Sequence, residues 1–337
     1  MISKILESLY LKVFVNIVVN KYETNVAIEL HSKDGMQSSD QDSFGTDKLD
    51  ASVLEFIKSY TQESPYYYIS ILDTSPSQGV IPTCEKSKLS YYESVDDSEY
   101  KCHKKSWTYY TSKNDLYAIE KNFQEIGVDF VFSPFSVLNK FFKDKIDSHM
   151  AMYVLVQDTA TIVMVFDNSK LLFGQLLSME NGIENEDLII DDDDEIDLDL
   201  EEGIDLEDID VVDDIEALED FGDIEDLDSL EDIAEFSETK DVEEEFYQDS
   251  EEELASHDSE GFNEDYQRFT LIQSAINRFY KDGRYESKFI ENIYIADAVG
   301  VTSDLKRYLE EEMFLSVYIR HIDLLAEVCE LAREEIA

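Results

Sequence analysis

The chain has 337 residues, of which 43% are hydrophobic and 12% aromatic, and its formal net charge is −52 at pH 7. That much apolar surface excludes a wholly disordered chain, and so negative a charge repels phosphate backbones and anionic lipid headgroups, which argues against direct binding of nucleic acid or membrane. With only 11 glycines and 4 prolines, the composition also disfavours a phosphate-binding enzyme built on glycine-rich loops.

The first 72 residues are predicted to be mostly strands. Two β-rich runs, Val13–Val19 and Thr24–Leu30, are separated by the polar stretch Asn20–Glu23, which predicts a hairpin. Residues 32–46 consist mainly of Ser, Asp, Gly and Gln, which predicts a loop. A short helix and a buried strand are expected next, over residues 52–60 and 66–72.

Helices and strands alternate through the rest of the chain. A second polar loop precedes Trp107, and the spacing of Leu116, Ile119 and Phe123 predicts a helix over 114–126. The apolar run 150–166 is interrupted by polar residues and indicates a hairpin, not a membrane span. The remaining expected strands are 128–132, 152–156, 161–166, 170–177, 290–295 and 315–319, and the remaining helices are 133–143, 266–280, 302–312 and 321–336. This mixture predicts the α/β or α+β class.

One segment holds most of the excess charge. Of the 79 acidic residues, 41 lie between Asn181 and Tyr266, where the only base is Lys240. Isoleucine and leucine recur there without a helical or strand period, a composition typical of segments that stay disordered alone and can present apolar anchors to a basic partner. We therefore predict an acidic, low-complexity, disordered insertion over 181–266, which is either a solvated spacer or a tether for a partner.

The cysteines and other reactive side chains predict no catalytic or metal site. Cys84, Cys102 and Cys329 are widely spaced, and the first 12 residues lack a cleavable apolar core, so we expect reduced thiols in a cytoplasmic protein. Cys102-His103 has no second Cys or His at ligand spacing, which favours an exposed basic loop over a zinc site. The other candidates lack the calcium-loop pattern or a nucleophile elbow; they are Asp191–Asp194, and Ser133, Ser136 and His149.

Three stretches resemble the actin-like ATPase superfamily, and most closely the type IV pilus assembly protein PilM and the cytoplasmic domain of the type II secretion protein GspL. Ala118–Ser136 is similar to the helix and strand that lead into the second lobe of that family. Tyr153–Phe173 is similar to the meander that opens this lobe, and Phe289–Ile319 to the strand, turn, helix and strand that close it. The resemblance implies a two-lobed actin-like (ribonuclease H-like) fold. The lobes would comprise residues 1–150, and residues 151–180 with 267–337, interrupted by the insertion 181–266.

The turns that bind ATP in this superfamily are altered here. Such turns offer backbone N–H groups to phosphates and need glycine for close approach. The first, Asn20–Glu23, and the second, Gln157–Ala160, contain no glycine, and the third, Ala296–Gly300, contains one. We therefore expect no cofactor and no catalysis, with Asp158, Thr159, Asp297 and Gly300 as vestigial positions of the nucleotide site.

The resemblance also implies partners. PilM grips the short cytoplasmic N-terminus of a bitopic inner-membrane protein, PilN, which has a PilO neighbour. We expect a cytoplasmic scaffold held peripherally on the inner membrane by such a partner, within a large oligomeric or ring assembly. The machine would be a type IV pilus, a type II secretion or DNA-uptake system, or a flagellar motor. Two alternatives stay open: an actin-like ATPase with an atypical ATP site, and an acidic regulatory or chaperone-like protein acting through residues 181–266.

Overall fold

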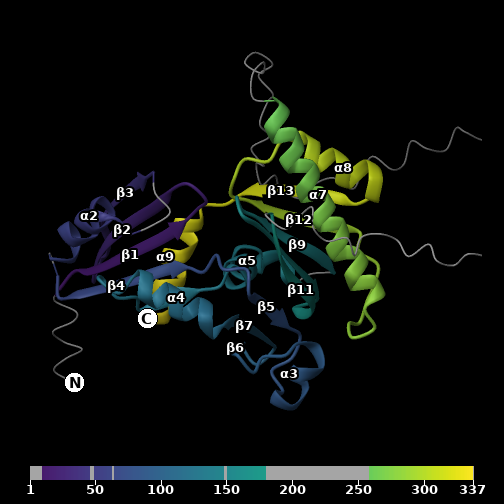
Figure 1. The fold of residues 1–337 in the computed structure, drawn as a ribbon, viewed down its shortest axis with the longest axis horizontal. Helices are drawn as coiled ribbons and strands as arrows, with labels where there is room; N and C mark the ends of the chain where they lie inside the picture. The colour runs from purple at the N-terminus through teal and green to yellow at the C-terminus, as the bar shows by residue number, and fades with distance from the viewer. Residues whose placement is uncertain (1–9, 46–48, 63, 148–149, 180–257, 337) are drawn as a thin grey trace, which may run out of the picture. The chain divides into compact units, whose positions relative to one another are not determined.

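The structure is a computed structural model that describes residues 10–45, 49–62, 64–147, 150–179 and 258–336 (Figure 1). The predicted insertion therefore lies largely outside the described residues, as does His149. The last part of the predicted insertion, residues 258–266, is described and is helical. Helix α7 begins at Asp258, whereas the sequence predicted a helix that begins at Tyr266. Within the described ranges, no helix has the length and hydrophobicity needed to span a bilayer.

Two five-stranded sheets carry the same topology. The first has the order β3-β2-β1-β4-β8, and the second has the order β11-β10-β9-β12-β13. In each, the first three strands pair antiparallel and the last two join them in parallel. The first sheet consists of β1 (Lys12–Val19), β2 (Thr24–Ser32), β3 (Gly35–Phe44), β4 (Tyr66–Leu72) and β8 (Phe130–Phe132), and the second of β9 (Ala151–Val156), β10 (Ala160–Asp167), β11 (Lys170–Ser178), β12 (Asn292–Asp297) and β13 (Ser316–His321).

This duplicated strand order is that of the actin-like, ribonuclease H-like fold, so the predicted fold class is confirmed. The predicted hairpin at 13–30 and the meander at 152–177 are present almost residue for residue, because their β-branched residues are buried. The run 150–166 forms the antiparallel β9–β10 hairpin, as expected.

The helices cover both faces of each sheet. The described helices are α2 (Ala51–Thr61), α3 (Lys86–Tyr92), α4 (Lys113–Asn122), α5 (Pro134–Phe141), α6 (Lys143–Ile146), α7 (Asp258–Lys281), α8 (Ser303–Met313) and α9 (Leu324–Ile336). One face of the first sheet packs on α2, through Val53 and Ile57, and on Phe123 at the end of α4. One face of the second sheet packs on α7 and α8, through residues such as Phe279 and Leu309.

The remaining two faces share one core. Helix α5 follows the first sheet in the chain but packs on β9 and β10 of the second, and α9 follows the second sheet but packs on β1, β2, β4 and β8 of the first. Their buried side chains, such as Phe135 of α5 and Val328 of α9, belong to one continuous cluster that includes Phe14 and Tyr153. Each sheet is thus completed by a helix from the other half of the chain.

Two predicted loops contain strands. Residues 32–46 include β3, which pairs with β2 and has mostly exposed side chains, so that no apolar alternation marks it in the sequence. The polar stretch before Trp107 contains α3 and two strands of a third sheet, which has the order β5-β7-β6. Its strands are β5 (Gln78–Ile81), β6 (Ser98–His103) and β7 (Trp107–Ser112).

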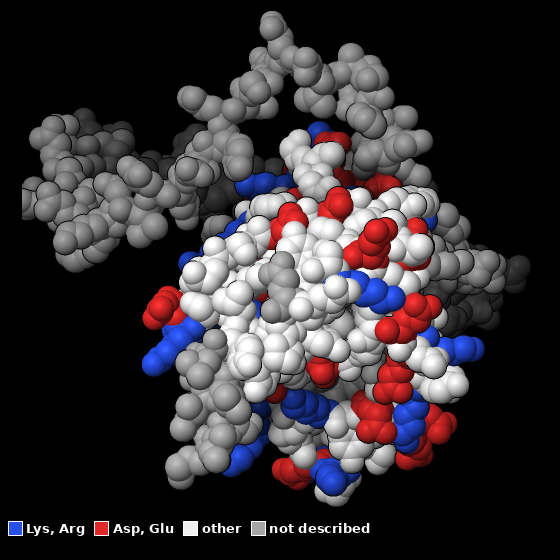
Figure 2. All heavy atoms as spheres, turned by 90° about the vertical axis from the view of Figure 1, so that its left-hand side faces the viewer, with Lys and Arg blue, Asp and Glu red and all other residues white. Residues whose placement is uncertain are grey.

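The described surface carries charges of both signs. Figure 2 shows the face that lies to the left in Figure 1, where basic and acidic side chains are interspersed around a broad uncharged area. On this face there is no large patch of charges of one sign. This agrees with the sequence, in which most of the excess negative charge lies between Asn181 and Tyr266 and not in the rest of the chain.

Candidate functional site

The three turns expected from an ancestral nucleotide site lie close together. The first two are tight: the Asn20 N–H donates to the Glu23 carbonyl at 2.8 Å, and the Gln157 N–H donates to the Ala160 carbonyl at 2.9 Å. Asp297, which opens the third turn, pairs with Val156 next to the second turn. The structure thus brings together the regions that the sequence singled out.

Asp158 lies near charges of the first turn and of helix α7. Burial raises the pKa of its carboxyl, and the acidic residues Glu23 and Glu264 raise it further. The cations Arg268 and Lys21 act in the opposite direction. Lys21 and Glu23 belong to the first turn, so the first two turns face one another across a space that already holds several charges.

The third turn is filled by its own side chain. The Asp297 carboxylate is 7% exposed and accepts three backbone hydrogen bonds, from Val299 at 3.0 Å, Gly300 at 2.9 Å and Val301 at 3.0 Å. Successive N–H groups of this kind form an anion-binding concavity in phosphate-binding loops. Here the bound anion is Asp297 itself, so these donors are not available to a phosphate.

A buried ion pair closes the space behind the second turn. The Arg268 guanidinium is 4% exposed and donates to Asp265 at 2.7 Å and to Glu264 at 2.9 Å. Asp265 also accepts from the backbone N–H and the hydroxyl of Thr302, the N-cap residue of α8. The carbonyl of Thr159 accepts from the Met179 N–H. These groups are thus engaged within the protein.

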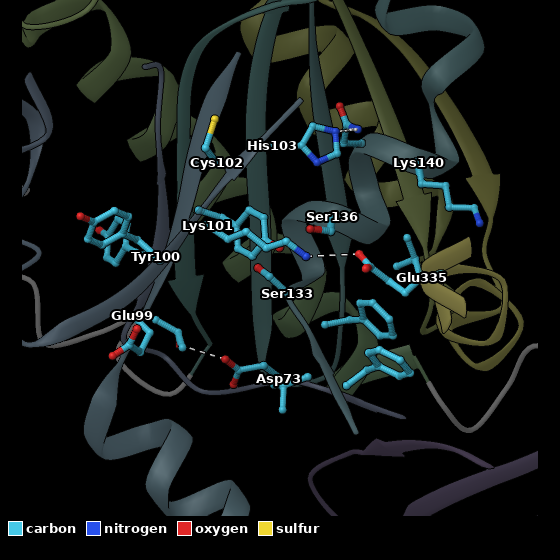
Figure 3. A pocket seen from close by; sticks show the side chains of 18 of the residues that line it. Asp73, Glu99, Tyr100, Lys101, Cys102, His103, Ser133, Ser136, Lys140 and Glu335 are labelled. Carbon is cyan, nitrogen blue, oxygen red and sulfur yellow. Dashed lines mark hydrogen bonds and ion pairs between the residues drawn. The ribbon is translucent and has the colours of Figure 1, made fainter. Parts of the chain in front are cut away.

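A separate cavity of about 780 Å³ lies between the third sheet and the first. Its walls are β6 and β7 on one side, and β8, α5 and the end of α9 on the other (Figure 3). We call it the groove. Both β6 and β8 are edge strands, since β6 pairs only with β7 and β8 only with β4 within the described residues. Two unpaired strand edges therefore border the same cavity.

The floor of the groove is polar. Asp73 is 2% exposed, and burial raises the pKa of its carboxyl, although hydrogen bonds from Ser75 and Thr111 partly offset this effect. The Ser133 hydroxyl donates to the Gln78 side chain at 2.8 Å, and the Gln78 amide donates to the Asp73 carbonyl at 3.0 Å. Ser133, which the sequence considered only as a nucleophile, thus anchors this network.

Helix α9 is tied to the groove by lysines. Figure 3 shows Lys101 of β6 reaching Glu335 of α9, with a separation of 3.2 Å between Nζ and Oε1. Lys140 of α5 lies 3.0 Å from carboxylates of both Glu330 and Glu334. The predicted basic residues Lys101, Lys104 and Lys105 are exposed, as expected, and the last two lie in the turn between β6 and β7. Lys101 lies on β6, where the carboxylate of Glu335 balances its charge.

His103 is a partly buried wall residue of the groove. Its ring stacks on Trp107 with centroids 4.6 Å apart, and the Asn139 amide lies 3.3 Å from its Nε2. Burial, together with the charges of Lys104 and Lys101, lowers the pKa of its imidazole to about 4. His103 is therefore neutral at pH 7, and Asn139 acts as a donor to the ring.

Two of the cysteines form a disulfide, which contradicts the prediction of three reduced thiols. Cys84, in the segment before α3, is bonded to Cys102 of β6, with their Cα atoms 5.5 Å apart. They are 18 positions apart in the sequence. The segment after β5 and the strand β6 flank β7, with Ile81 and Cys102 both opposite Thr108, so their spacing alone could not reveal the contact. Cys329 is a buried free thiol.

Comparison with known families shows which family the chain belongs to. Residues 152–337 match a family described as "Domain of unknown function (DUF8341)". This match covers more than half of the chain. The chain belongs to this family. Residues 10–139 match a second one, "Domain of unknown function (DUF8569)". No functionally curated protein is detectably similar in sequence.

Several solved structures are similar in fold. The PilM–PilN type IV pilus biogenesis complex aligns over 94% of each chain, with 9% identity and a TM-score of 0.46. A Bacteroides thetaiotaomicron protein with an actin-like ATPase fold and unknown function aligns over 92% of this chain and 91% of its own, with 11% identity and a TM-score of 0.45. EutJ from Carboxydothermus hydrogenoformans covers 95% and 88%, with 6% identity and a TM-score of 0.36. At these identities the likeness says nothing about ligands.

Proposed function

We propose that this protein is a non-catalytic scaffold subunit whose groove binds an extended peptide from a membrane-protein partner. The observation that supports this is the pair of unpaired strand edges, β6 and β8, on one cavity of about 780 Å³. An extended peptide gains affinity by adding main-chain hydrogen bonds to such an edge, and alternate side chains enter neighbouring pockets. Exposed Tyr100 and half-buried Phe130 offer aromatic contact surface at the two edges.

The partner type follows from the sequence resemblance to PilM. The peptide would be the short cytoplasmic N-terminus of a bitopic, PilN-like inner-membrane protein with a PilO-like neighbour. The chain would then be a cytoplasmic protein, held peripherally on the inner membrane, within an oligomeric assembly of a pilus, secretion, DNA-uptake or flagellar machine. Absence of ATP binding belongs to the same proposal, because Asp297 occupies the donors of the third turn and charged side chains of both signs already lie near Asp158 of the second.

Co-purification with matched edge-strand variants tests the groove. The tagged chain is isolated from detergent-solubilised membranes of its host, as wild type, Tyr100→Ala and Tyr318→Ala. Tyr100 is 41% exposed on the edge strand β6, and Tyr318 is 52% exposed on the edge strand β13. We expect a small bitopic protein with the wild type and with Tyr318→Ala, and a loss of at least about tenfold with Tyr100→Ala, as for a hot-spot aromatic residue.

Other outcomes would favour one of the two alternative functions. Recovery of soluble basic partners that depend on residues 181–266 would favour the acidic regulatory or chaperone-like alternative. A rise in melting temperature with Mg-ATP would favour the ATPase, because a ligand that binds the folded state must stabilise it. Purification of the wild type without any bitopic membrane protein would contradict the scaffold proposal.

A further inference from the structure

A second cluster of reactive side chains lies away from the groove, between the first sheet and α9. Glu29 and His31 occupy alternate positions of β2 and so share one face of the sheet, the face that α9 covers. Cys329 of α9 is buried directly over them. The His31 Nε2 lies 2.6 Å from the Glu29 carboxylate. The thiol, the imidazole and the carboxylate thus meet at one point.

The distances suit a single metal ion. One ligand atom from each of the three residues lies within 4.8 Å of the other two. A tetrahedral ion with bonds of about 2.0–2.3 Å holds its ligand atoms roughly 3.3–3.8 Å apart. The His31–Glu29 separation of 2.6 Å is shorter than that value, and the other separations do not exceed 4.8 Å, so side-chain adjustments of about an ångström would bring all three atoms into one coordination sphere.

A buried amide beside the cluster has an unsatisfied oxygen. Asn16 of β1 is 0% exposed and pairs with Ala27, one alternate position before Glu29 on the same face. Its Nδ2 lies 3.5 Å from the Ala27 carbonyl, and the side-chain N–H group is within hydrogen-bonding reach of the Cys329 sulfur. The Oδ1 of the same amide has no hydrogen-bond partner in the described part of the chain. Because an unsatisfied buried polar atom is costly, this oxygen beside the cluster is a candidate donor to a further ligand.

The strand that carries Glu29 and His31 is regular and partly accessible. It pairs with β1 without interruption through His31, and the register shift beside it places the extra residue, Gln37, on β3. The side chains of His31 and Glu29 are 12% and 18% exposed, which leaves a path for an ion from solvent. Arg333, one turn beyond Cys329 on α9, acts on Glu29 electrostatically.

We propose that Glu29, His31 and Cys329 form a binding site for a divalent transition-metal ion, with the Asn16 amide oxygen as a fourth donor. Thiolate, imidazole and carboxylate together are ligands that Zn²⁺ accepts in tetrahedral sites, and the thiolate disfavours Mg²⁺ and Ca²⁺. On binding, the Cys329 thiol releases its proton to solvent and its sulfur coordinates the ion. The ion joins α9 to the β1–β2 hairpin and so supports the wall of the groove that α9 contributes.

Cobalt(II) tests the site, because a cobalt–thiolate bond gives a charge-transfer absorption band that carboxylates do not give. The full chain contains three cysteines, so each can be assigned by substitution. The metal-free protein is titrated with Co²⁺ alone as wild type, Cys84→Ser/Cys102→Ser, Cys329→Ser and His31→Gln. The double variant is the matched control, since it removes the two disulfide-bonded cysteines outside the cluster, and the acidic segment cannot contribute to the band.

We expect one Co²⁺ per chain with a thiolate band in the wild type and in the double variant, displaced by Zn²⁺. Cys329→Ser should lose the band. His31→Gln, which keeps all three cysteines, should weaken Co²⁺ binding by roughly 10–100-fold, the loss seen even for supporting partners of a metal ligand. Circular dichroism confirms that each variant is folded. Absence of the band from the folded double variant, or its persistence in Cys329→Ser, would overturn the proposal.

Discussion

The imidazole of His103 shows how packing sets the chemistry of a single residue. It stacks on the Trp107 indole, accepts from the Asn139 amide, and lies near Lys101 and Lys104. Burial and the charges of the two lysines favour the neutral ring, because a protonated imidazole would lose solvent and meet two cations. Its lowered pKa therefore couples folding to pH.

The sign of this coupling gives a prediction for His103. Its folded pKa is about 4 against 6.5 for the free group, so the stability due to the neutral ring is complete above pH 6.5 and is lost as the pH falls to 4. Relative to His103→Gln, which cannot protonate, the wild type should lose at most about 3 kcal/mol of unfolding free energy over this interval. Urea unfolding at pH 7, 5 and 4 measures the difference, and parallel pH profiles would contradict it.

Asp297 gives a second prediction at this scale. Its carboxylate satisfies three backbone N–H groups of the turn that precedes α8. Asp297→Ala leaves these donors without a protein partner, so we expect the unfolding free energy to fall by about 3 kcal/mol, because each lost bond to a charged acceptor costs about 1–3 kcal/mol and water recovers part of it.

Asp297→Asn is the control for this substitution. Its Oδ1 can still accept from Val299 and Gly300, while its NH₂ group faces the Val301 N–H, so an intermediate loss is expected in chemical denaturation. A variant Asp297→Ala as stable as the wild type would mean that the carboxylate does not fill the turn.

At the scale of elements, close contact between the third sheet and the second fixes the position of the groove. Gly174 of β11 lies against Val80 of β5: a Cβ at Gly174 would lie 2.2 Å from Val80 Cγ2 and 3.2 Å from the Val163 carbonyl. Only a glycine at this position lets β5 approach β11 so closely. The third sheet carries β6, so this contact also positions one wall of the groove.

Substitution of Gly174 tests this contact. Gly174→Ala should lower the unfolding free energy by about 1–3 kcal/mol through overpacking. Val80→Ala should remove part of this penalty, because it deletes the atom that the new methyl group meets. A double-mutant cycle measures the coupling, and additive effects of the two substitutions would show that β5 and β11 do not touch as described.

The elements also show what the sequence could predict. Buried strands such as β1 and β9, and the helix α2 with its Asp50 cap, follow from local patterns of apolar residues and capping. The strands β3 and β6 do not, because their side chains are mostly exposed and carry no apolar alternation. The short strand β5 does not either, because it is joined to its partner β7 across a long stretch of chain. The same reason hid the Cys84–Cys102 disulfide.

The candidate sites were still harder to predict from the sequence, because most of them depend on long-range packing. The altered turns at Asn20, Asp158 and Asp297 could be read from the sequence because loss of glycine is local information. The groove and the cluster of His31 with Cys329 could not, since α9 at the end of the chain supplies one wall of each. A bioinformatic signal for them would require knowledge of which sheet α9 covers.

At the scale of the whole molecule, the exchange of helices between the two halves governs folding. Helix α5 covers the second sheet and α9 covers the first, so neither half contains its complete core. The buried residues of α9 include Leu325 and Val328, and burial of each such side chain contributes about 1.5–3 kcal/mol. Against a typical total of about 5–15 kcal/mol for a folded domain, loss of this helix would be decisive.

Division of the chain tests this dependence. Residues 1–149 and 150–337, expressed separately, should each lack cooperative unfolding, because a sheet face that α9 or α5 normally covers is left exposed to water. Expressed together, they should form a one-to-one complex that unfolds cooperatively, since each fragment supplies the helix the other needs. Thermal unfolding followed by circular dichroism, with size-exclusion chromatography of the mixture, measures both. A fragment 1–149 that unfolds cooperatively on its own would show that α9 is dispensable to the first sheet, and the core shared by α5 and α9 would then be an interface between independent domains.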